Sequence, residues 1–285
     1  AEALRLAKAA LDGQRAANRD LSEARDLAEA AGRARTEFLA RMSHEIRTPI
    51  AGVLGMVELL LSSDLDEDQR FHAAAARDSA RGLLTIISDA LDLGRIEAGK
   101  LRVVDEEFDP RAVIEGAVAL IAPGAWSQGL ELGCFVGPEV PARIRGDADR
   151  LRQVLLNLLG NALRYTEAGE IALRAGLSQE GSETLLRVEV VDSGIGIDLD
   201  ATPRATLFRA FEQAEAFETR KRGGAGLGLS IASQLVTLMG GRLDVASELG
   251  RGSTFFFQVR VGPPGHPAGP PPELPSGLPG RKIVV

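Results

Sequence analysis

A histidine with a carboxylate beside it and a hydroxyl one helical turn later is the part of this sequence best suited to nucleophilic chemistry. In the run FLARMSHEIRTPI, His44 is followed directly by Glu45 and, four residues on, by Thr48. Neutral imidazole is a nucleophile near pH 7, and an adjacent carboxylate can orient the ring and take up proton charge. In a helix His44 and Thr48 share a face. A lone histidine on a helix is more often an ordinary surface or core residue, so the motif needs support from elsewhere in the chain.

The bulk composition narrows the classes of function. The 285 residues are 45% hydrophobic and 26% charged, with a net charge of −7, which gives no electrostatic footprint for nucleic acid. No run approaches the roughly 18 to 20 apolar residues of a membrane helix, and no signal peptide opens the chain. We therefore expect a cytoplasmic segment, with a membrane anchor elsewhere in a longer protein left open. The single cysteine, Cys134, excludes an intrachain disulfide and is expected to be a small buried hydrophobe.

The first hundred residues predict a helical hairpin. Residues 1–62 are rich in Ala, Leu, Arg and Glu, which are good helix formers, and a second amphipathic helix is predicted from Glu67 to Ile96. Within residues 1–34 the heptad spacing is interrupted by polar residues, so a coiled-coil linker and a solvated helical linker both stay open. A lone hairpin buries its apolar faces poorly. We therefore predict a homodimer through residues 35–100, which pair as a four-helix bundle.

A mixed helix and strand pattern follows and predicts a separate α/β domain at residues 101–262, so the fold class is α+β. Its predicted elements are helices at Phe108–Ala122 and Ala148–Tyr165 and strands at Glu170–Ala175, Leu185–Val191 and Thr254–Val261. Residues 263–280 are too rich in Pro and Gly to pack and are expected to be a spacer. Residues 281–285 end in an apolar run that would suit the first strand of a further domain.

The second predicted helix of this domain carries polar residues at helical spacing. Asn157 and Asn161 are four residues apart and share a face, with Arg164 and Tyr165 just after them. An asparagine oxygen can bind Mg²⁺, and an arginine can neutralise phosphate oxygens. Taken alone the pattern is weak, because polar residues on an amphipathic helix usually face water.

A predicted strand ends at Asp192, in the run VEVVDSGIGID. Gly194 and Gly196 allow a tight turn with close approach of the backbone. An aspartate at the mouth of such a turn can accept a hydrogen bond from the exocyclic amine of adenine, the edge at which ATP and GTP differ. An ordinary Asp-Ser-Gly turn is an equally good interpretation of these residues alone.

A glycine-rich run, GGAGLGLS at residues 223–230, directly precedes an apolar helix. Glycines that open a helix expose backbone amides and the positive end of the helix dipole to phosphate. No Gly-Lys-Ser/Thr follows, so this is not a Walker loop, and the strand-first dinucleotide fingerprint is also absent. The charged residues 219–222 before it have the composition of a lid over a triphosphate, or of a solvated loop.

Together, and in this order, the motifs resemble those of the bacterial sensor histidine kinases. The matching segments are SHEIRTP, NLLGNALRYT, DSGIGI, LFRAFEQ and GGAGLGLS, and they spread over residues 36–260. The resemblance implies a dimeric helical hairpin followed by an ATP-binding sandwich of the type shared with gyrase B, Hsp90 and MutL. Residues 239–257 match the closing strands of that family, while Ala225 stands where many relatives have threonine. The family also implies an upstream sensor domain and a response-regulator receiver domain, attached or separate, as partners.

The resemblance assigns roles position by position. It implies that His44 accepts the phosphoryl group, Glu45 acts as acid or base, and Thr48 supports a phosphatase reaction. For the nucleotide site it implies ATP and Mg²⁺ as ligands, with Asn161 binding Mg²⁺ and Asp192 reading adenine. The other residues that it places at the nucleotide are Asn157, Arg164, Tyr165, Gly194, Gly196, Gly224, Gly226, Leu227, Gly228 and Thr254.

The implied function is ATP- and Mg²⁺-dependent autophosphorylation of His44, followed by transfer to an aspartate of a receiver domain. One alternative is an ATPase of the gyrase or Hsp90 type, which Asn157 disfavours because it stands where those enzymes keep a catalytic glutamate. Another is a nucleotide-binding signalling scaffold without phosphotransfer. Whether the kinase or the phosphatase reaction dominates stays open at this point.

Overall fold

The chain forms two units, which divide between Leu101 and Arg102. The computed structural model describes residues 45–181, 183–210 and 226–263. The predicted linker at residues 1–34, the last five residues and the spacer beyond Pro263 lie outside this part. Among the described helices, none is both long enough and apolar enough to cross a bilayer.

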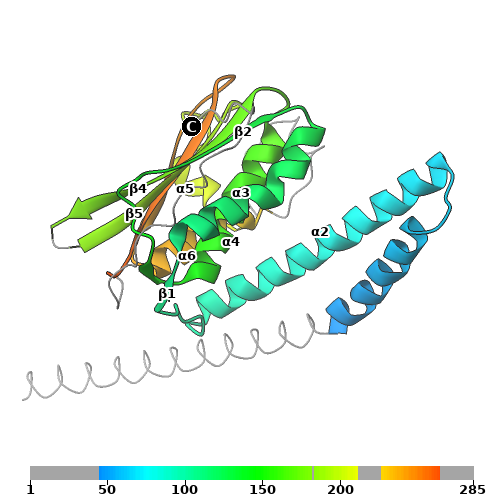
Figure 1. Cartoon of the computed structure of the whole chain (residues 1–285), viewed down its shortest axis with the longest axis horizontal. Coiled ribbons are helices and arrows are strands. Elements are labelled where there is room, and N and C mark those ends of the chain that lie inside the picture. The colour runs from blue at the N-terminus through cyan, green and yellow to red at the C-terminus, as the bar shows by residue number, and fades with distance from the viewer. Residues whose placement is uncertain (1–44, 182, 211–225, 264–285) are drawn as a thin grey trace, which may run out of the picture. The chain divides into compact units, whose positions relative to one another are not determined.

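The first unit is an antiparallel helical hairpin, as predicted. One helix covers the described residues 45–61, and the second, α2, runs from Glu67 to Glu97 (Figure 1). Asp66 starts α2 through a capping box: its carboxylate accepts a hydrogen bond from the Gln69 amide at 2.8 Å, and the Gln69 side chain accepts one from the Asp66 amide at 3.3 Å. The turn residues foreseen in the sequence therefore fix where the second helix begins.

A single hairpin leaves much of its apolar surface exposed. Glu58 and Arg81 tie the two helices together through a 2.9 Å ion pair, and the side chains of Val57, Leu91 and Leu93 are buried. The exposed apolar side chains of the hairpin are Ile46, Val53, Met56, Leu59, Leu60, Phe71, Leu83 and Ile86. Apolar side chains in such number along one helical pair indicate a surface that another element covers.

The second unit is a sheet with helices on one face. Five strands pair in the order β2-β4-β5-β7-β6, parallel between β2 and β4 and antiparallel elsewhere. The strands are β2 (Glu131–Val136), β4 (Glu170–Glu180), β5 (Glu183–Asp192), β6 (Arg242–Glu248) and β7 (Gly252–Arg260). A separate antiparallel pair joins β1 (Glu106–Phe108) to β3 (Ile144–Gly146).

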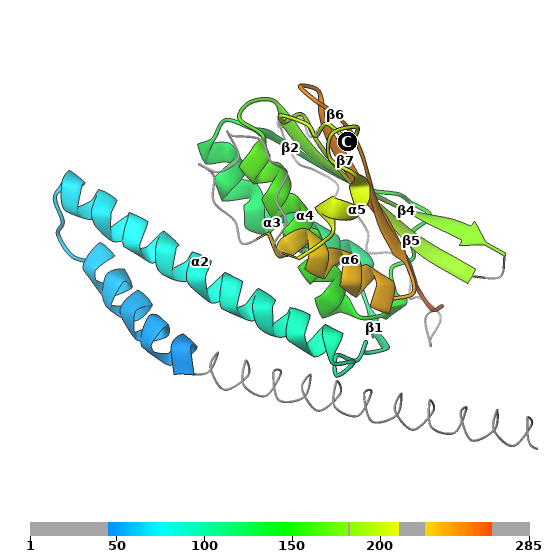
Figure 2. The same ribbon diagram turned by 180° about the vertical axis from the view of Figure 1, so that it is seen from behind.

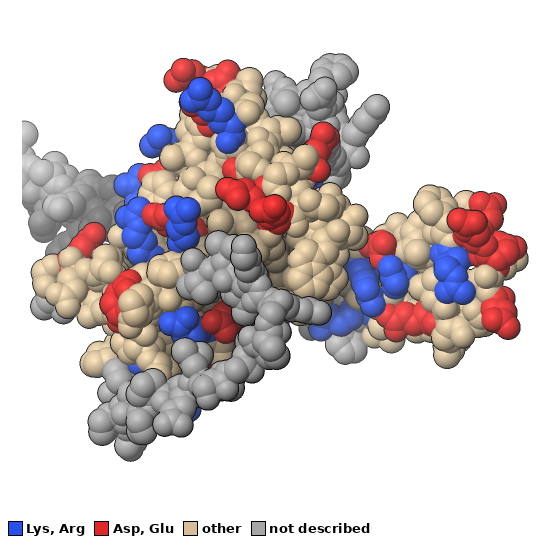
Figure 3. Space-filling model, turned by 45° about the horizontal axis from the view of Figure 1, so that its top comes forward, with Lys and Arg blue, Asp and Glu red and all other residues tan. Residues whose placement is uncertain are grey.

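Three helices cover the inner face of this sheet (Figure 2). They are α3 (Pro110–Ser127), α4 (Ala148–Tyr165) and α6 (Gly228–Leu238), and a short helix, α5 (Arg204–Leu207), lies in the connection before α6. The core between the layers is fully apolar at its centre, with Leu155, Leu158 and Leu159 of α4 buried together with Leu186 of β5 and Phe257 of β7. On the view in Figure 3 the basic and acidic side chains are interspersed.

An aspartate begins each of the longer helices of the second unit except α6. Asp109 caps α3 by accepting a hydrogen bond from the amide of Ala112 at 3.1 Å. Asp147, which is buried, accepts one from the Arg150 amide at 3.0 Å and, through its other oxygen, one from the Val104 amide at 2.9 Å. Asp147 therefore fixes the start of α4 and attaches the incoming chain to it.

The predicted elements match the structure unevenly. The prediction for α4 is confirmed at both ends, and the strands predicted within β4 and β5 are confirmed with longer bounds. The last predicted strand is confirmed with shifted bounds, because β7 begins two residues before Thr254 and ends one residue before Val261. The helix predicted at Phe108–Ala122 instead runs from Pro110 to Ser127: Asp109 caps its start, and it continues past Pro123 with Ala125 buried. Strands β1, β2 and β3 were not predicted, whereas β6 lies in residues 239–257, which the family resemblance assigned to closing strands.

Candidate functional site

Asp192 ends β5 as a buried carboxylate, with only 6% of its surface exposed. One oxygen, Oδ1, accepts hydrogen bonds from the amides of Gly194 at 2.9 Å and Ser253 at 3.3 Å. Within the described part of the chain, the other oxygen, Oδ2, accepts none. Burial raises the pKa of the Asp192 carboxyl, and the two backbone hydrogen bonds oppose that shift in part. The site therefore presents one unsatisfied acceptor from a fixed carboxylate.

The turn after Asp192 is held on both sides by segments far away in the sequence. The Ile195 amide donates to the carbonyl of Tyr165 at 3.1 Å, and the Ile195 carbonyl accepts from Gly250 at 2.7 Å. Side chains would not fit here: a Cβ at Gly194 would overlap the Tyr165 carbonyl, and one at Gly196 would overlap the carbonyl of Glu248. The two glycines predicted at this site are thus positions where another backbone segment approaches too closely for a side chain.

Ser253, and not Thr254, lies beside Asp192. The two residues are paired in register on β5 and β7, and directly opposed residues of an antiparallel pair point to the same face. Thr254 pairs with Val191 and so points to the outer face, away from Asp192. Sequence reasoning missed Ser253, although the alternation of buried Phe255, Phe257 and Val259 along β7 was the signal that would have placed it on the inner face.

Helix α4 brings the predicted polar residues to the neighbourhood of this turn and of α6. The Asn157 side-chain amide donates to the carbonyl of Gly228 at 3.2 Å. Asn161, one turn on, is half-buried, and its side chain makes no hydrogen bond to any described residue. Arg164 is exposed and forms no ion pair within the described ranges, and Tyr165 gives its carbonyl to the turn after Asp192. An amide and a cation on α4 are therefore available to a ligand.

The start of α6 has backbone amides that could bind an anion. Among the described residues no side chain caps it, in contrast to the aspartate caps of α2, α3 and α4. Gly226 has a φ of +68°, Leu227 is buried, and Gly228 opens the helix beside Asn157. Uncapped amides at a helix N-terminus carry partial positive charge and bind phosphate well. Gly224, the fourth residue predicted here, lies outside the described residues.

The two predicted catalytic neighbours of the histidine lie in the hairpin. Glu45 and Thr48 are exposed on the first helix, in its first described turn. His44 itself falls just outside the described residues. The structure therefore places Glu45 and Thr48 on an accessible helix surface and leaves the position of the imidazole as a prediction.

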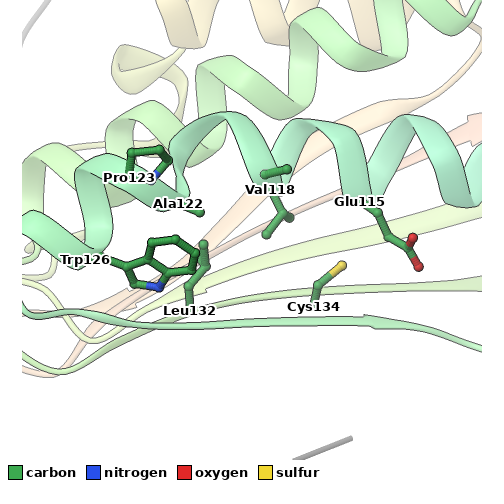
Figure 4. A pocket seen from close by; sticks show the side chains of 8 residues that line it. Glu115, Val118, Ala122, Pro123, Trp126, Leu132 and Cys134 are labelled. Carbon is green, nitrogen blue, oxygen red and sulfur yellow. The ribbon is translucent and has the colours of Figure 1, made fainter. Parts of the chain in front are cut away.

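A separate groove lies between α3 and the edge strand β2 and encloses about 350 Å³ (Figure 4). It is lined by Glu115, Val118, Ala119, Ala122, Pro123, Trp126, Leu132 and Cys134, and so contains none of the residues predicted to bind nucleotide. The expectation that Cys134 is buried is wrong: it is exposed, because β2 has no neighbour on its outer side within the five-stranded sheet. The apolar lining does not suit phosphate.

Gly252→Ala is expected to destabilise the second unit by about 2 kcal/mol or more. Gly252 has a φ of +100°, where L-residues are strained, and a Cβ there would overlap the Asp192 carbonyl. Gly250→Ala is the matched control, because Gly250 has a φ of +79° in the same turn but open space around its Cα. Urea unfolding followed by circular dichroism measures both, and equal losses for the two variants would contradict the overlap.

The fold and the site together define a class of protein. Residues 146–263 match the family described as histidine kinase-, DNA gyrase B-, and HSP90-like ATPase, and residues 34–99 match the His Kinase A (phospho-acceptor) domain. The second unit is thus a nucleotide-binding domain of this ATPase class. With both domains present in this order, the chain belongs to the sensor histidine kinases.

Several characterised proteins are similar to this chain. Hybrid signal transduction histidine kinase L of Dictyostelium discoideum is 45% identical over 219 residues, which cover 76% of this chain and 13% of that protein. Signal transduction histidine-protein kinase BarA of Escherichia coli (strain K12) is 40% identical over 247 residues, 86% of this chain and 26% of BarA. The chain therefore spans only a small part of these relatives.

Two solved structures of histidine kinases are similar to this chain. The crystal structure of full-length ShkA in complex with AMPPNP has 38% sequence identity and a TM-score of 0.65, and the match covers 79% of this chain and 46% of that one. The Acinetobacter baumannii histidine kinase AdeS, at 22% identity and a TM-score of 0.51 over 76% of this chain and 97% of that one, shares the fold.

Proposed function

We propose that this chain catalyses ATP- and Mg²⁺-dependent autophosphorylation of His44 and then transfers the phosphoryl group to an aspartate of a receiver domain. The proposed nucleotide binding rests on one observation: α4 forms hydrogen bonds both to the turn after Asp192 and to the start of α6. Tyr165 of α4 holds the turn after Asp192, and Asn157 holds the start of α6, eight residues or about 12 Å away along the helix. This separation suits a molecule with a base at one end and phosphates at the other.

Each predicted residue has a definite task in this proposal. Asp192 accepts a hydrogen bond from the adenine amine through Oδ2, and the uncapped amides at Gly228 face phosphate oxygens. Asn161 would hold Mg²⁺, and the fit rests on its amide having no partner among the described residues. When bound, the metal neutralises charge on the phosphates. Arg164 adds a cation that is free of ion pairs in the described part of the chain.

His44 is the proposed acceptor of the γ-phosphoryl group. Phosphoryl transfer requires mainly an in-line approach and neutralised charge, so the protein contributes positioning more than covalent chemistry. Glu45, as the next residue, is the proposed acid or base for the imidazole. Thr48 lies one turn further along the same exposed helix and is the proposed residue that positions a water for hydrolysis of the phosphoryl group on a receiver domain, a phosphatase reaction.

A homodimer through residues 35–100 is part of the proposal. The support is the set of exposed apolar side chains on the hairpin, among them Val53, Met56 and Leu59, which are all more than half exposed. A second hairpin packed against these side chains would remove them from water in a four-helix bundle. An upstream sensor domain and a receiver domain, attached or separate, are the further proposed partners, and the cytoplasm is the proposed location because ATP is found there.

Two other functions are weaker. A hydrolytic ATPase needs a general base near the γ-phosphate, and Asn157 offers an amide whose nitrogen is already bonded to the Gly228 carbonyl. A nucleotide-binding scaffold without phosphotransfer would share the adenine contact at Asp192, but it gives no role to the His44, Glu45 and Thr48 motif.

Labelling tests the proposal directly. The chain, incubated with γ-labelled ATP and Mg²⁺, should acquire label that is lost in acid and retained in base, as a phosphoramidate is. No label, or label stable to acid, would contradict phosphorylation of a histidine. Release of inorganic phosphate without any labelled protein would favour the ATPase.

A further inference from the structure

Ser247, at the end of β6, makes three hydrogen bonds with one hydroxyl. Its Oγ lies 2.7 Å from the Ile197 amide, 2.9 Å from the Gly252 carbonyl oxygen and 2.9 Å from the hydroxyl of Ser253. Ser247 and Ser253 are paired in register on β6 and β7, and Ser253 is paired with Asp192 on β5. The three side chains therefore form one row across three neighbouring strands, on the face that the helices cover.

The direction of each of these hydrogen bonds is determined. A serine hydroxyl has one proton to donate and two lone pairs with which to accept. The Ile197 amide can only donate and the Gly252 carbonyl can only accept, so Ser247 gives its proton to Gly252. The remaining lone pair then accepts from Ser253. The hydroxyl of Ser247 is thereby fully used, which fixes its orientation.

The hydrogen bonds of Ser247 act on the two segments that donate to Asp192. The carbonyl of Gly252 and the amide of Ser253 belong to the same peptide group, so Ser247 holds the plane whose N–H donates to Oδ1 of Asp192. Ile197 lies at the far end of the turn that begins with the other donor to that oxygen, Gly194. Asp192 does not contact Ser247, yet both of its hydrogen-bond donors belong to segments that Ser247 anchors.

We propose that Ser247 is a positioning residue for adenine selection: it fixes the peptide and the turn that hold Oδ1 of Asp192, and so directs Oδ2 toward the exocyclic amine of the base. The inference rests on the proposed binding of adenine nucleotide. It assigns Ser247 a role that depends on the base, since a nucleotide whose base has no amine at this position gains nothing from a well-directed Asp192.

The test compares ADP with inosine diphosphate, which carries a carbonyl where ADP carries the amine. Isothermal titration of Ser247→Ala should give ADP binding about tenfold weaker than that of the unaltered chain, with inosine diphosphate binding changed by less than about twofold. The preference for ADP then falls by about tenfold. Ser247→Thr keeps the hydroxyl and should restore the preference. Ser178→Ala is the matched control, because Ser178 accepts a 3.5 Å hydrogen bond from Gln258 at the other end of the same sheet.

Equal weakening of both nucleotides by Ser247→Ala would overturn the proposal, because it would indicate general loosening of the domain. An unchanged preference would overturn it as well. If Ser247→Ala gives no folded protein, Ser247→Cys retains a small side chain with only weak hydrogen bonds, and a full preference for ADP in that variant would refute the role. Failure of the unaltered chain to bind either nucleotide would contradict the proposed function instead, so the two failures are distinguishable.

Discussion

A chain that carries His44→Gln should acquire no acid-labile phosphate from γ-labelled ATP, while its affinity for ADP stays that of the unaltered chain. Glutamine has a similar length and hydrogen-bonding capacity, but its amide nitrogen is not a nucleophile as neutral imidazole is. The residues proposed to bind nucleotide all lie beyond Leu101, in the other unit, so their hydrogen bonds do not depend on position 44. The two measurements are filter-bound label, with acid and base washes, and titration calorimetry.

The hairpin provides a matched control for this variant. His72 is the other histidine of the helical unit; it is exposed on α2 and stacks edge-on against Phe71, with ring centroids 5.6 Å apart. His72→Gln changes the same side chain in the same unit and should leave labelling intact. Label that persists in His44→Gln, or that disappears in His72→Gln, would contradict His44 as the acceptor.

Local patterns predicted the elements that carry most of the site. Asn157 and Asn161 share a face because helical spacing alone places them there, and α4 was predicted with its observed bounds. The position of Asp192 at the end of a strand also followed from local alternation and the glycines after it. The proposed roles of these residues could also be predicted in part, because amide and carboxylate side chains are suited to binding metal, phosphate or adenine.

Contacts between distant segments could not be predicted in the same way. Ser253 lies 61 residues after the carboxylate that it holds, and Ser247 lies 50 residues after the amide that it accepts from. Such contacts follow from the strand order, in which β7 lies between β5 and β6, and nothing local to either segment encodes that order. The contact between Asn157 of α4 and Gly228 at the start of α6 likewise depends on how these two helices pack against each other.

Some features that the sequence-based strand prediction did not include had a local signal. In β6, Leu243, Val245 and Ser247 alternate with more exposed residues, which is the pattern of a strand with one buried face. The same alternation along β7 puts Ser253 on the buried face, with Phe255 and Phe257, and Thr254 on the opposite face. By contrast, β2 shows little alternation: as an edge strand, it leaves consecutive residues such as Cys134 and Phe135 exposed, so no single buried face is visible in its sequence.

Asp192→Asn is expected to weaken ADP binding about 100-fold. The two backbone amides that donate to Oδ1 require an oxygen at that position, so the new NH₂ group must take the place of Oδ2. That group cannot accept a hydrogen bond from the adenine amine and opposes it with a second donor. Loss of one buried hydrogen bond, with a donor left unsatisfied, corresponds to about 2 to 3 kcal/mol. Titration calorimetry with ADP measures the change.

The same substitution should not destabilise the nucleotide-free chain. Burial raises the pKa of the Asp192 carboxyl in the folded state, so its ionised form opposes folding, and this penalty disappears as the pH falls through the raised pKa. Asparagine has the same shape and carries no charge. We therefore expect its midpoint of thermal unfolding to equal or exceed that of the unaltered chain at about pH 8, with the difference shrinking as the pH falls through the raised pKa toward the ordinary value of 3.8.

The opposite directions of these two effects separate a role in binding from a role in folding. If Asp192 served the fold, its replacement would lower the unfolding temperature and weaken all nucleotides together. If it reads the base, the asparagine NH₂ group should donate to the carbonyl of inosine diphosphate, so that this nucleotide binds more tightly than ADP and the preference is inverted. A lower unfolding temperature without that inversion would contradict Asp192 as the residue that selects adenine.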